Sequence, residues 1–238
     1  FALLADGAVV ADEAPGWWLE DFPLNRARLS DIPDQAFSLS TSTAQTIEMV
    51  KALQRAEPDE SRALAVSGLR AGGSFVSLWD AVFLSAADAV MNRPSIPMLH
   101  CVTVSHAFYA LWQRTSDPIM RRVIPLQAVS YVAQMKNQRR EGGWNGLDVL
   151  QLTPTDESPN PKELALELGE ELGYGPERAR RLILSYPLDS QWWHLRQVLN
   201  HWLLYKSNKA HDFKFGAAVL ETMEWISPQW RAAYLAAS

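Results

Sequence analysis

Apolar side chains recur at helical spacing along most of this chain, and this periodicity limits the folds open to it. In residues 74–92, one stripe of a helix would carry Leu78, Val82, Ala86 and Val90. Segments of this kind are separated by Pro, Gly and helix-capping residues, while alternating strand patterns are few and short. The sequence therefore predicts an all-α protein, a compact multi-helix domain whose short connections make neighbouring helices mostly antiparallel.

The helical signal divides the chain into four parts. Residues 1–40 show little periodicity and are expected to be irregular, with a short helix starting at Trp17. Residues 41–141 form a first helical half, and residues 142–160 form a polar, Pro-containing linker loop. Residues 161–238 form a second helical half, which carries a cluster of His and Lys residues.

Composition and charge exclude several classes of partner. The net charge is −5 and the Lys and Arg residues are scattered, which argues against a nucleic-acid surface. Ser, Asp and Arg interrupt every apolar run, so no membrane span is expected. The chain is 47% hydrophobic and has ten Trp, enough for a sizeable core.

The single cysteine, Cys101, cannot form an internal disulfide and leaves the redox compartment undecided. We expect a cytoplasmic protein, with export left open. Because the first residue is Phe, we also expect that further residues precede it. Cys101 follows His100, but adjacent residues on a helix diverge by about 100°, so a small buried hydrophobe is expected here and not a Cys–His nucleophile.

The remaining chemistry lies in the second helical half. Three of the five histidines fall within eighteen residues, and Lys214 follows them. His194 and His201 are seven residues apart, which places them within about 20° of each other on one helix stripe. His211 and Lys214 are three residues apart, about 60° around the axis. Such a group is either a set of solvated surface residues or the ligands of a metal ion.

Imidazole ligands suit iron, zinc, copper or nickel, and are poor for magnesium or calcium. A buried Lys near a cation has a lowered pKa and becomes neutral. A neutral amine can react with carbon dioxide to give a carbamate, which is chemically a carboxylate. Histidines and a carbamate would then imitate the two-His, one-carboxylate arrangement of non-haem iron oxygenases. Asp80, a lone acid on an apolar helix, is expected on a solvated face or beside a metal-bound His.

Two stretches resemble the questin oxidase-like family. Pro97-Met-Leu-His100-Cys-Val-Thr103, followed by Ala107 and Leu111, is similar to that family's apolar–His–x–Val–Thr helix. Ala210-His211-Asp-Phe-Lys214, followed by Ala217-Ala218 and later by residues 234–238, is similar to its His-x-x-Lys segment. The resemblance implies a helical oxidase of polycyclic aromatic ketones with a mononuclear non-haem iron. The ligands it implies are His100, His211 and a modified Lys214.

Residues 1–40 contain no histidine to match the family's N-terminal His-containing helix. That ligand would come from a missing N-terminal portion or from another chain, or the site would be incomplete. His106 does not replace it, because six residues separate it from His100, about 120° around a helix.

The leading hypothesis is a metal-dependent oxidase or oxygenase of an aromatic or apolar organic substrate, with iron as the cofactor. The predicted ligands are His100, His211 and Lys214, with His194 or His201 as an additional one, beside a pocket lined by Trp and Phe. The alternative is a non-catalytic helical subunit or interaction protein, paired with a missing N-terminal portion or a related chain. It requires His100 and His211 to point at different neighbours. A structural zinc ion is a third possibility.

Overall fold

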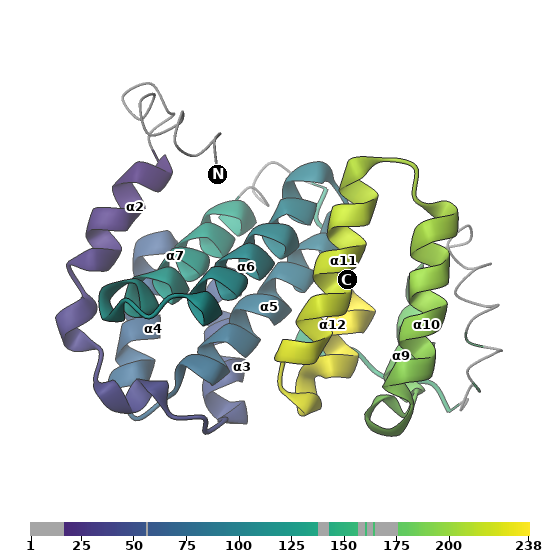
Figure 1. Cartoon of the computed structure of the whole chain (residues 1–238), viewed down its shortest axis with the longest axis horizontal. Helices are drawn as coiled ribbons and strands as arrows, with labels where there is room; N and C mark the ends of the chain where they lie inside the picture. Colours follow the sequence, from purple (N-terminus) through teal and green to yellow (C-terminus); the bar gives the residue numbers. More distant parts are fainter. Residues whose placement is uncertain (1–16, 56, 138–142, 157–159, 161–163, 165–175) are drawn as a thin grey trace.

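The computed structural model describes residues 17–55, 57–137, 143–156, 160, 164 and 176–238. Within these ranges the chain forms ten α-helices and several short 3₁₀ turns, with no strand (Figure 1). The prediction of an all-α fold is confirmed. The helix expected at residues 161–172 lies outside the described residues, apart from Leu164, which is buried.

Helix α5, Phe75–Asn92, is the centre of the molecule. It packs against α3 (Thr43–Arg55), α6 (Ile96–Arg114) and α7 (Pro118–Asn137), and also against α12 (Arg231–Ala237). Sixteen of its eighteen residues are buried because apolar side chains surround its axis almost completely. The helix begins at Ser74, whose hydroxyl accepts a hydrogen bond from the backbone N–H of Ser77 at 3.2 Å.

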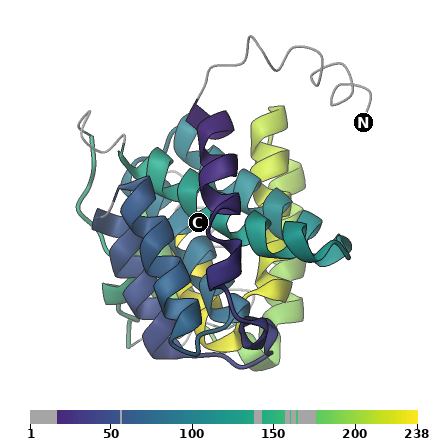
Figure 2. The same ribbon diagram turned by 90° about the vertical axis from the view of Figure 1, so that its left-hand side faces the viewer.

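Helices α2 (Trp17–Arg26) and α4 (Pro58–Arg70) cover α7 on one side of the bundle. Figure 2 shows this side, with α2 in front of the bundle. The short helix expected from Trp17 is therefore present, and two 3₁₀ turns, Leu29–Asp31 and Asp34–Phe37, follow it. Residues 17–37 are thus more regular than the sequence indicated. The buried Arg62 of α4 forms ion pairs with Asp21 and Asp59, which ties α2 to α4.

The described part of the expected linker, residues 143–156, is fixed to the C-terminal half of α5. Asn92 accepts the backbone N–H of Leu147 on its side-chain oxygen at 2.7 Å, and Val149 N–H donates to Oδ1 of Asp88 at 3.0 Å. The other oxygen of Asp88 pairs with Nζ of Lys136 on α7 at 2.6 Å, and both side chains are buried. This segment is therefore held by the core rather than being a free connection.

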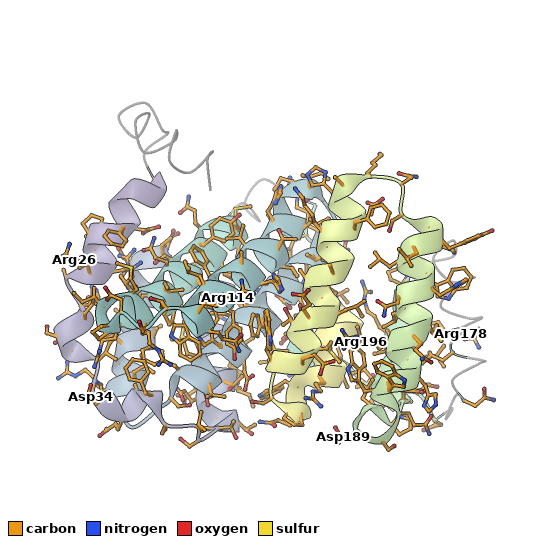
Figure 3. All side chains as sticks on the ribbon, in the orientation of Figure 1. Arg26, Asp34, Arg114, Arg178, Asp189 and Arg196 are labelled. Atoms are coloured by element: carbon orange, nitrogen blue, oxygen red, sulfur yellow. The ribbon has the colours of Figure 1, made fainter. Side chains whose placement is uncertain are left out.

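The C-terminal part contains α9 (Pro176–Ser185), α10 (Leu188–Lys206), α11 (Ala210–Trp225) and α12. α11 packs on α6, and α12 packs on both α5 and α9. α10 runs beside α11 in the described part of the molecule (Figure 1). Figure 3 shows Arg196 between these two helices, where its Nη1 donates to Oε1 of Glu224 at 2.8 Å.

One helix of the described residues, α5, is long and apolar enough to cross a membrane by length and composition alone. The expectation that charged and polar residues interrupt every apolar run does not hold for this helix, although it contains Asp80 and Asp88. In the structure, 89% of that window is buried inside the protein, so packing in the core already accounts for its apolar character.

Candidate functional site

His100 and His211 lie next to each other, although they are far apart in the sequence. α6 carries His100, α11 carries His211, and these two helices pack together. The centroids of the two imidazole rings are 5.6 Å apart, and the rings are nearly perpendicular, at 77°. Both side chains are half-buried. The structure therefore brings together the two histidines that the resemblance singled out.

The start of each helix sets the position of its histidine. His100 lies in the first part of α6, and its Nδ1 is 3.5 Å from the hydroxyl of Thr103, a long contact one turn further on. His211 is the second residue of α11. The carboxylate of Asp212 accepts the backbone N–H groups of Asn208 and Lys209 at 3.2 and 3.3 Å, which fixes the beginning of this helix.

Lys214 lies almost one turn beyond His211 on α11 and is exposed. The sequence hypothesis required a buried amine, because burial makes a lysine neutral. The packing of the described residues does not provide that burial. A role for Lys214 as a ligand therefore depends on the metal ion itself and not on a buried position.

His194 and His201 are both exposed on α10. The ring of His201 stacks on Tyr205, with centroids 5.9 Å apart and 7° between the planes. In the part of the chain that the structure describes, no group of three or more His, Cys, Asp or Glu side chains could hold a metal ion. The structure therefore does not bring His194 or His201 to the His100–His211 pair, and the expected additional ligand from α10 has no geometric support.

His106 and Cys101, also on α6, have neighbours of their own. Nε2 of His106 is 2.7 Å from a carboxylate oxygen of Glu221, and its ring stacks on Trp225 with centroids 4.8 Å apart. His106 and His100 therefore serve different neighbours, as their spacing predicted. Cys101 is completely buried, and loss of hydration raises the pKa of its thiol to about 12. It is a packed hydrophobic residue and not a nucleophile.

Asp80 is buried, which differs from the solvated face that the sequence favoured. Its Oδ1 accepts the backbone N–H of Ser227, just beyond the end of α11, at 2.9 Å. Burial raises the pKa of the Asp80 carboxyl, and hydrogen bonds from Ser227 oppose that shift. Asp80 thus joins α5 to the chain between α11 and α12.

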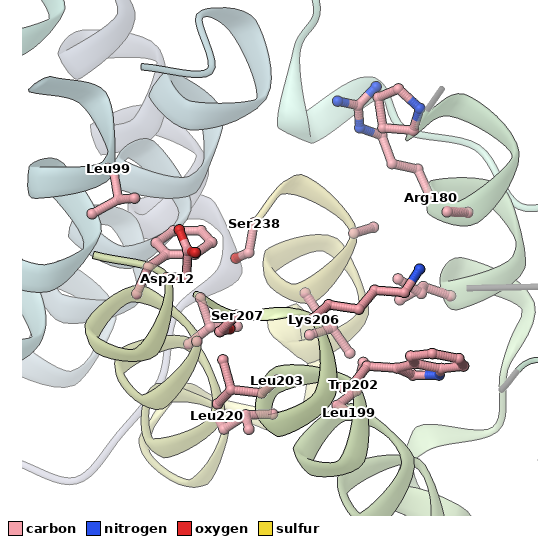
Figure 4. Close-up of a pocket in the computed structure, with 18 residues that line it drawn as sticks. Leu99, Arg180, Leu199, Trp202, Leu203, Lys206, Ser207, Asp212, Leu220 and Ser238 are labelled. Carbon is pink, nitrogen blue, oxygen red and sulfur yellow. The ribbon is translucent and has the colours of Figure 1, made fainter. Parts of the chain in front are cut away.

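A cavity of about 550 Å³ lies between α9, α10, α11 and α12, and Leu99 of α6 also contributes to its wall (Figure 4). Leu99 and Asp212, which are the sequence neighbours of His100 and His211, line this cavity, whereas the two imidazoles do not. A wall of Trp and Phe was expected, but aliphatic side chains predominate in the described lining. Among the described residues, the two aromatic side chains in the lining are Trp202 and Phe215.

Sequence reasoning did not single out the two cations in this lining, Arg180 and Lys206. The amphipathic pattern of α9 was the available signal, because its apolar stripe includes Leu182 and Ile183, both of which are buried. That pattern locates a buried face but does not indicate an adjacent cavity.

No family model, no curated protein and no solved structure matches this chain. The resemblance to the questin oxidase-like family therefore stays a prediction that rests on the residues of α6 and α11.

Proposed function

We propose that this protein is a metal-dependent oxidase or oxygenase, with a non-haem iron ion, that acts on an aromatic or otherwise apolar organic substrate. The observation that carries this proposal is the contact between His100 and His211, whose ring centroids are 5.6 Å apart. The resemblance of the α6 and α11 segments to the questin oxidase-like family supports the same function.

The two imidazoles fit a shared metal ion. With metal–nitrogen distances of about 2.1 Å, two histidines on one ion hold their ring centroids about 5 Å apart, which is close to the observed separation. His100 and His211 would hold the ion, and Lys214 would join them as a carbamate. A bound iron ion would supply the chemistry that activates dioxygen.

The residues of this chain would orient the ligands and limit access of water. The contact from Thr103 to Nδ1 of His100 leaves Nε2 of that ring for a metal, which is how outer-shell partners commonly orient ligand histidines. The neighbouring cavity has a mainly aliphatic wall, which suits an apolar substrate and a reaction that water would disturb.

The alternative of a non-catalytic subunit requires the two histidines to point at different neighbours. Their rings instead contact each other, with centroids 5.6 Å apart. A chelating pair gives a physical reason for this arrangement, so we favour the metal-dependent enzyme.

The test is the transition-metal content of the purified full chain after exposure to iron, zinc, copper or nickel. We expect a stoichiometric metal in the wild-type protein, and its loss in His100→Ala and in His211→Ala. His201→Ala is the matched control, because this exposed histidine lies away from the pair, and it should retain the metal. A wild-type protein without stoichiometric metal at any pH where it is folded would overturn the proposal.

Lys214 has a separate test. Lys214→Arg should lose metal because a guanidinium stays charged at any working pH, whereas Lys214→Glu should retain some of it, because a carboxylate replaces a carbamate. Loss of the metal should also lower the melting temperature, because a bound ligand stabilises the native state. If Lys214 is an ordinary surface residue, Lys214→Arg will keep its metal and change stability by less than about 0.5 kcal/mol.

A further inference from the structure

The cavity between α9 and α12 has an uneven distribution of charge. Its wall is mainly aliphatic, with Leu199 and Leu203 from α10 and Val219 and Leu220 from α11. Two cationic side chains, Arg180 of α9 and Lys206 of α10, are also part of the lining. Figure 4 shows Lys206 near Trp202 and Arg180 above them, both on the right-hand side of the view. One side of an apolar cavity therefore carries two positive charges.

The opposite side of the cavity is formed by Leu99, Asp212 and Ser238 (Figure 4). Asp212 is the acidic residue among the described lining residues, and its carboxylate already accepts two backbone N–H groups at the start of α11. This carboxylate therefore serves the helix and lies away from the two cations. The two cationic side chains therefore lie at the end of the cavity formed by α9 and α10. The opposite end is formed by Leu99 and Asp212, the sequence neighbours of the two histidines.

Arg180 is half-buried at the positive end. Burial lowers the pKa of its guanidinium, and Glu177, three residues earlier on α9, opposes that shift. A guanidinium that has lost part of its hydration gains most from an anion, and it can bind a carboxylate through two parallel hydrogen bonds. Lys206 holds its ammonium group 4.8 Å from the ring of Trp202, which keeps this charge near the same end.

We propose that this cavity binds a small apolar molecule that carries one anionic group, with a carboxylate as the simplest case. The anionic group lies at Arg180 and Lys206, and the apolar part extends along Leu203 and Val219 toward Leu99. A volume of about 550 Å³ is within the usual range for small-molecule sites. A nucleotide or a sugar fits less well, because the aliphatic wall offers few partners for their many polar groups.

This arrangement would position the ligand relative to the histidine pair. An anion held at α9 and α10 directs the apolar end of the molecule toward Leu99 and Asp212, which adjoin His100 and His211 in the sequence. The idea that this ligand is the substrate of an oxidase rests on the proposed function. The binding of the ligand in the cavity does not rest on it, because none of the proposed metal ligands is part of the lining.

The experiment compares two probes of the same shape, 2-naphthoate and its neutral analogue 2-naphthamide, in calorimetric titrations of the full chain. We expect naphthoate to bind more tightly. Arg180→Gln and Lys206→Gln should each weaken naphthoate binding roughly ten- to a hundredfold, the usual range for a lost hydrogen bond to a charged group. Neither substitution should change the affinity for naphthamide.

Arg181→Gln is the matched control, because Arg181 is the exposed next residue of α9 and does not line the cavity. It should leave the binding of both probes unchanged. Ala179→Phe fills the cavity from the same helix and should abolish the binding of both probes. Equal affinities for naphthoate and naphthamide would overturn the inference, and so would an equal loss in Arg180→Gln and Arg181→Gln.

Measuring metal content and probe binding together separates this inference from the proposed function, and His211→Ala should lose the metal while keeping its affinity for naphthoate. If the wild-type protein binds naphthoate but never binds a metal, the proposed metal-dependent activity is wrong and the proposed binding site for an anionic ligand is still supported. A protein that binds metal through His100 and His211 but does not distinguish the two probes would refute the ligand site alone.

Discussion

Helices α5 and α10 are almost equal in length, with 18 and 19 residues, but they differ sharply in burial. α5 buries sixteen residues, including Asp80 and Asp88. α10 buries two, while Trp193, Leu204 and Tyr205 expose 63, 73 and 75% of their surface. The number of neighbours among the described helices explains this difference, because four of them surround α5 while α10 packs mainly on α11. Position in the bundle, and not side-chain polarity alone, decides which residues are buried.

The two helices also use their polar residues differently. In α5 each buried carboxylate joins the core to a distant part of the chain, Asp88 to Lys136 and Asp80 to Ser227. In α10 the polar contacts lie at the surface, where Trp192 and Arg196 both donate to Glu224. α10 forms one wall of the cavity, and few of its apolar side chains are buried against the described residues. A helix of this kind opens at lower free energy than a core helix, which suits a site that must admit a ligand.

The largest expected effect comes from the buried pair on α5 and α7. Lys136→Met keeps much of the side-chain volume but leaves Asp88 as an uncompensated buried charge. We expect a loss of about 3–5 kcal/mol in the free energy of unfolding, measured by urea denaturation. Lys51→Met, at an exposed position on α3, is the control and should stay within about 0.5 kcal/mol. A similar small loss in Lys136→Met would show that α5 does not depend on its buried charges.

A smaller effect is expected at Asp80. Asp80→Ala leaves the N–H of Ser227 without its partner and should cost about 1–3 kcal/mol. Asp80→Asn keeps an acceptor for that N–H but cannot ionise. Comparing this variant with the wild type therefore isolates the effect of the Asp80 charge on stability.

The contribution of Asp80 to the free energy of unfolding should decrease as the pH rises. The pKa of Asp80 in the folded protein is raised above its ordinary value of 3.8 by burial. Folding therefore favours the protonated form, and the contribution of Asp80 to stability is lost as the pH rises through its folded pKa. The unfolding free energy of the wild type should fall relative to that of Asp80→Asn between pH 3.8 and neutrality. Parallel curves for the two proteins would contradict this prediction.

The smallest effect is expected on α10. Leu204→Gln and Tyr205→Gln remove exposed apolar surface that has few neighbours among the described residues, so each should change the free energy of unfolding by less than about 0.5 kcal/mol. Thermal unfolding of the two variants beside the wild type measures this. A loss above 1 kcal/mol that depends on protein concentration would mean that another copy of the chain covers this face, and the contrast with α5 would then apply to the isolated chain only.

Much of the helical fold follows from local pattern. The apolar stripe of residues 74–92 corresponds to α5 (Phe75–Asn92), and the capping signal at Asp117-Pro118 corresponds to the start of α7 at Pro118. These signals are readable because a helix and its caps depend on residues within a few positions of one another. The residues after Trp17 form α2, although their pattern is weak, because α7 provides the surface on which this helix packs.

The candidate site was predictable only in part. The sequence by itself determined the helices and placed one histidine near the start of each of two of them, since local spacing fixes where a side chain lies on its own helix. Spacing also put His194 and His201 on one stripe, but it could not say that this stripe faces solvent. Only the tertiary structure decided that His100 meets His211, that Lys214 is exposed, and that Arg180 and Lys206 share a cavity. The physical reason is that these relations depend on how whole helices pack, and the packing of one helix depends on apolar surface contributed by distant parts of the chain.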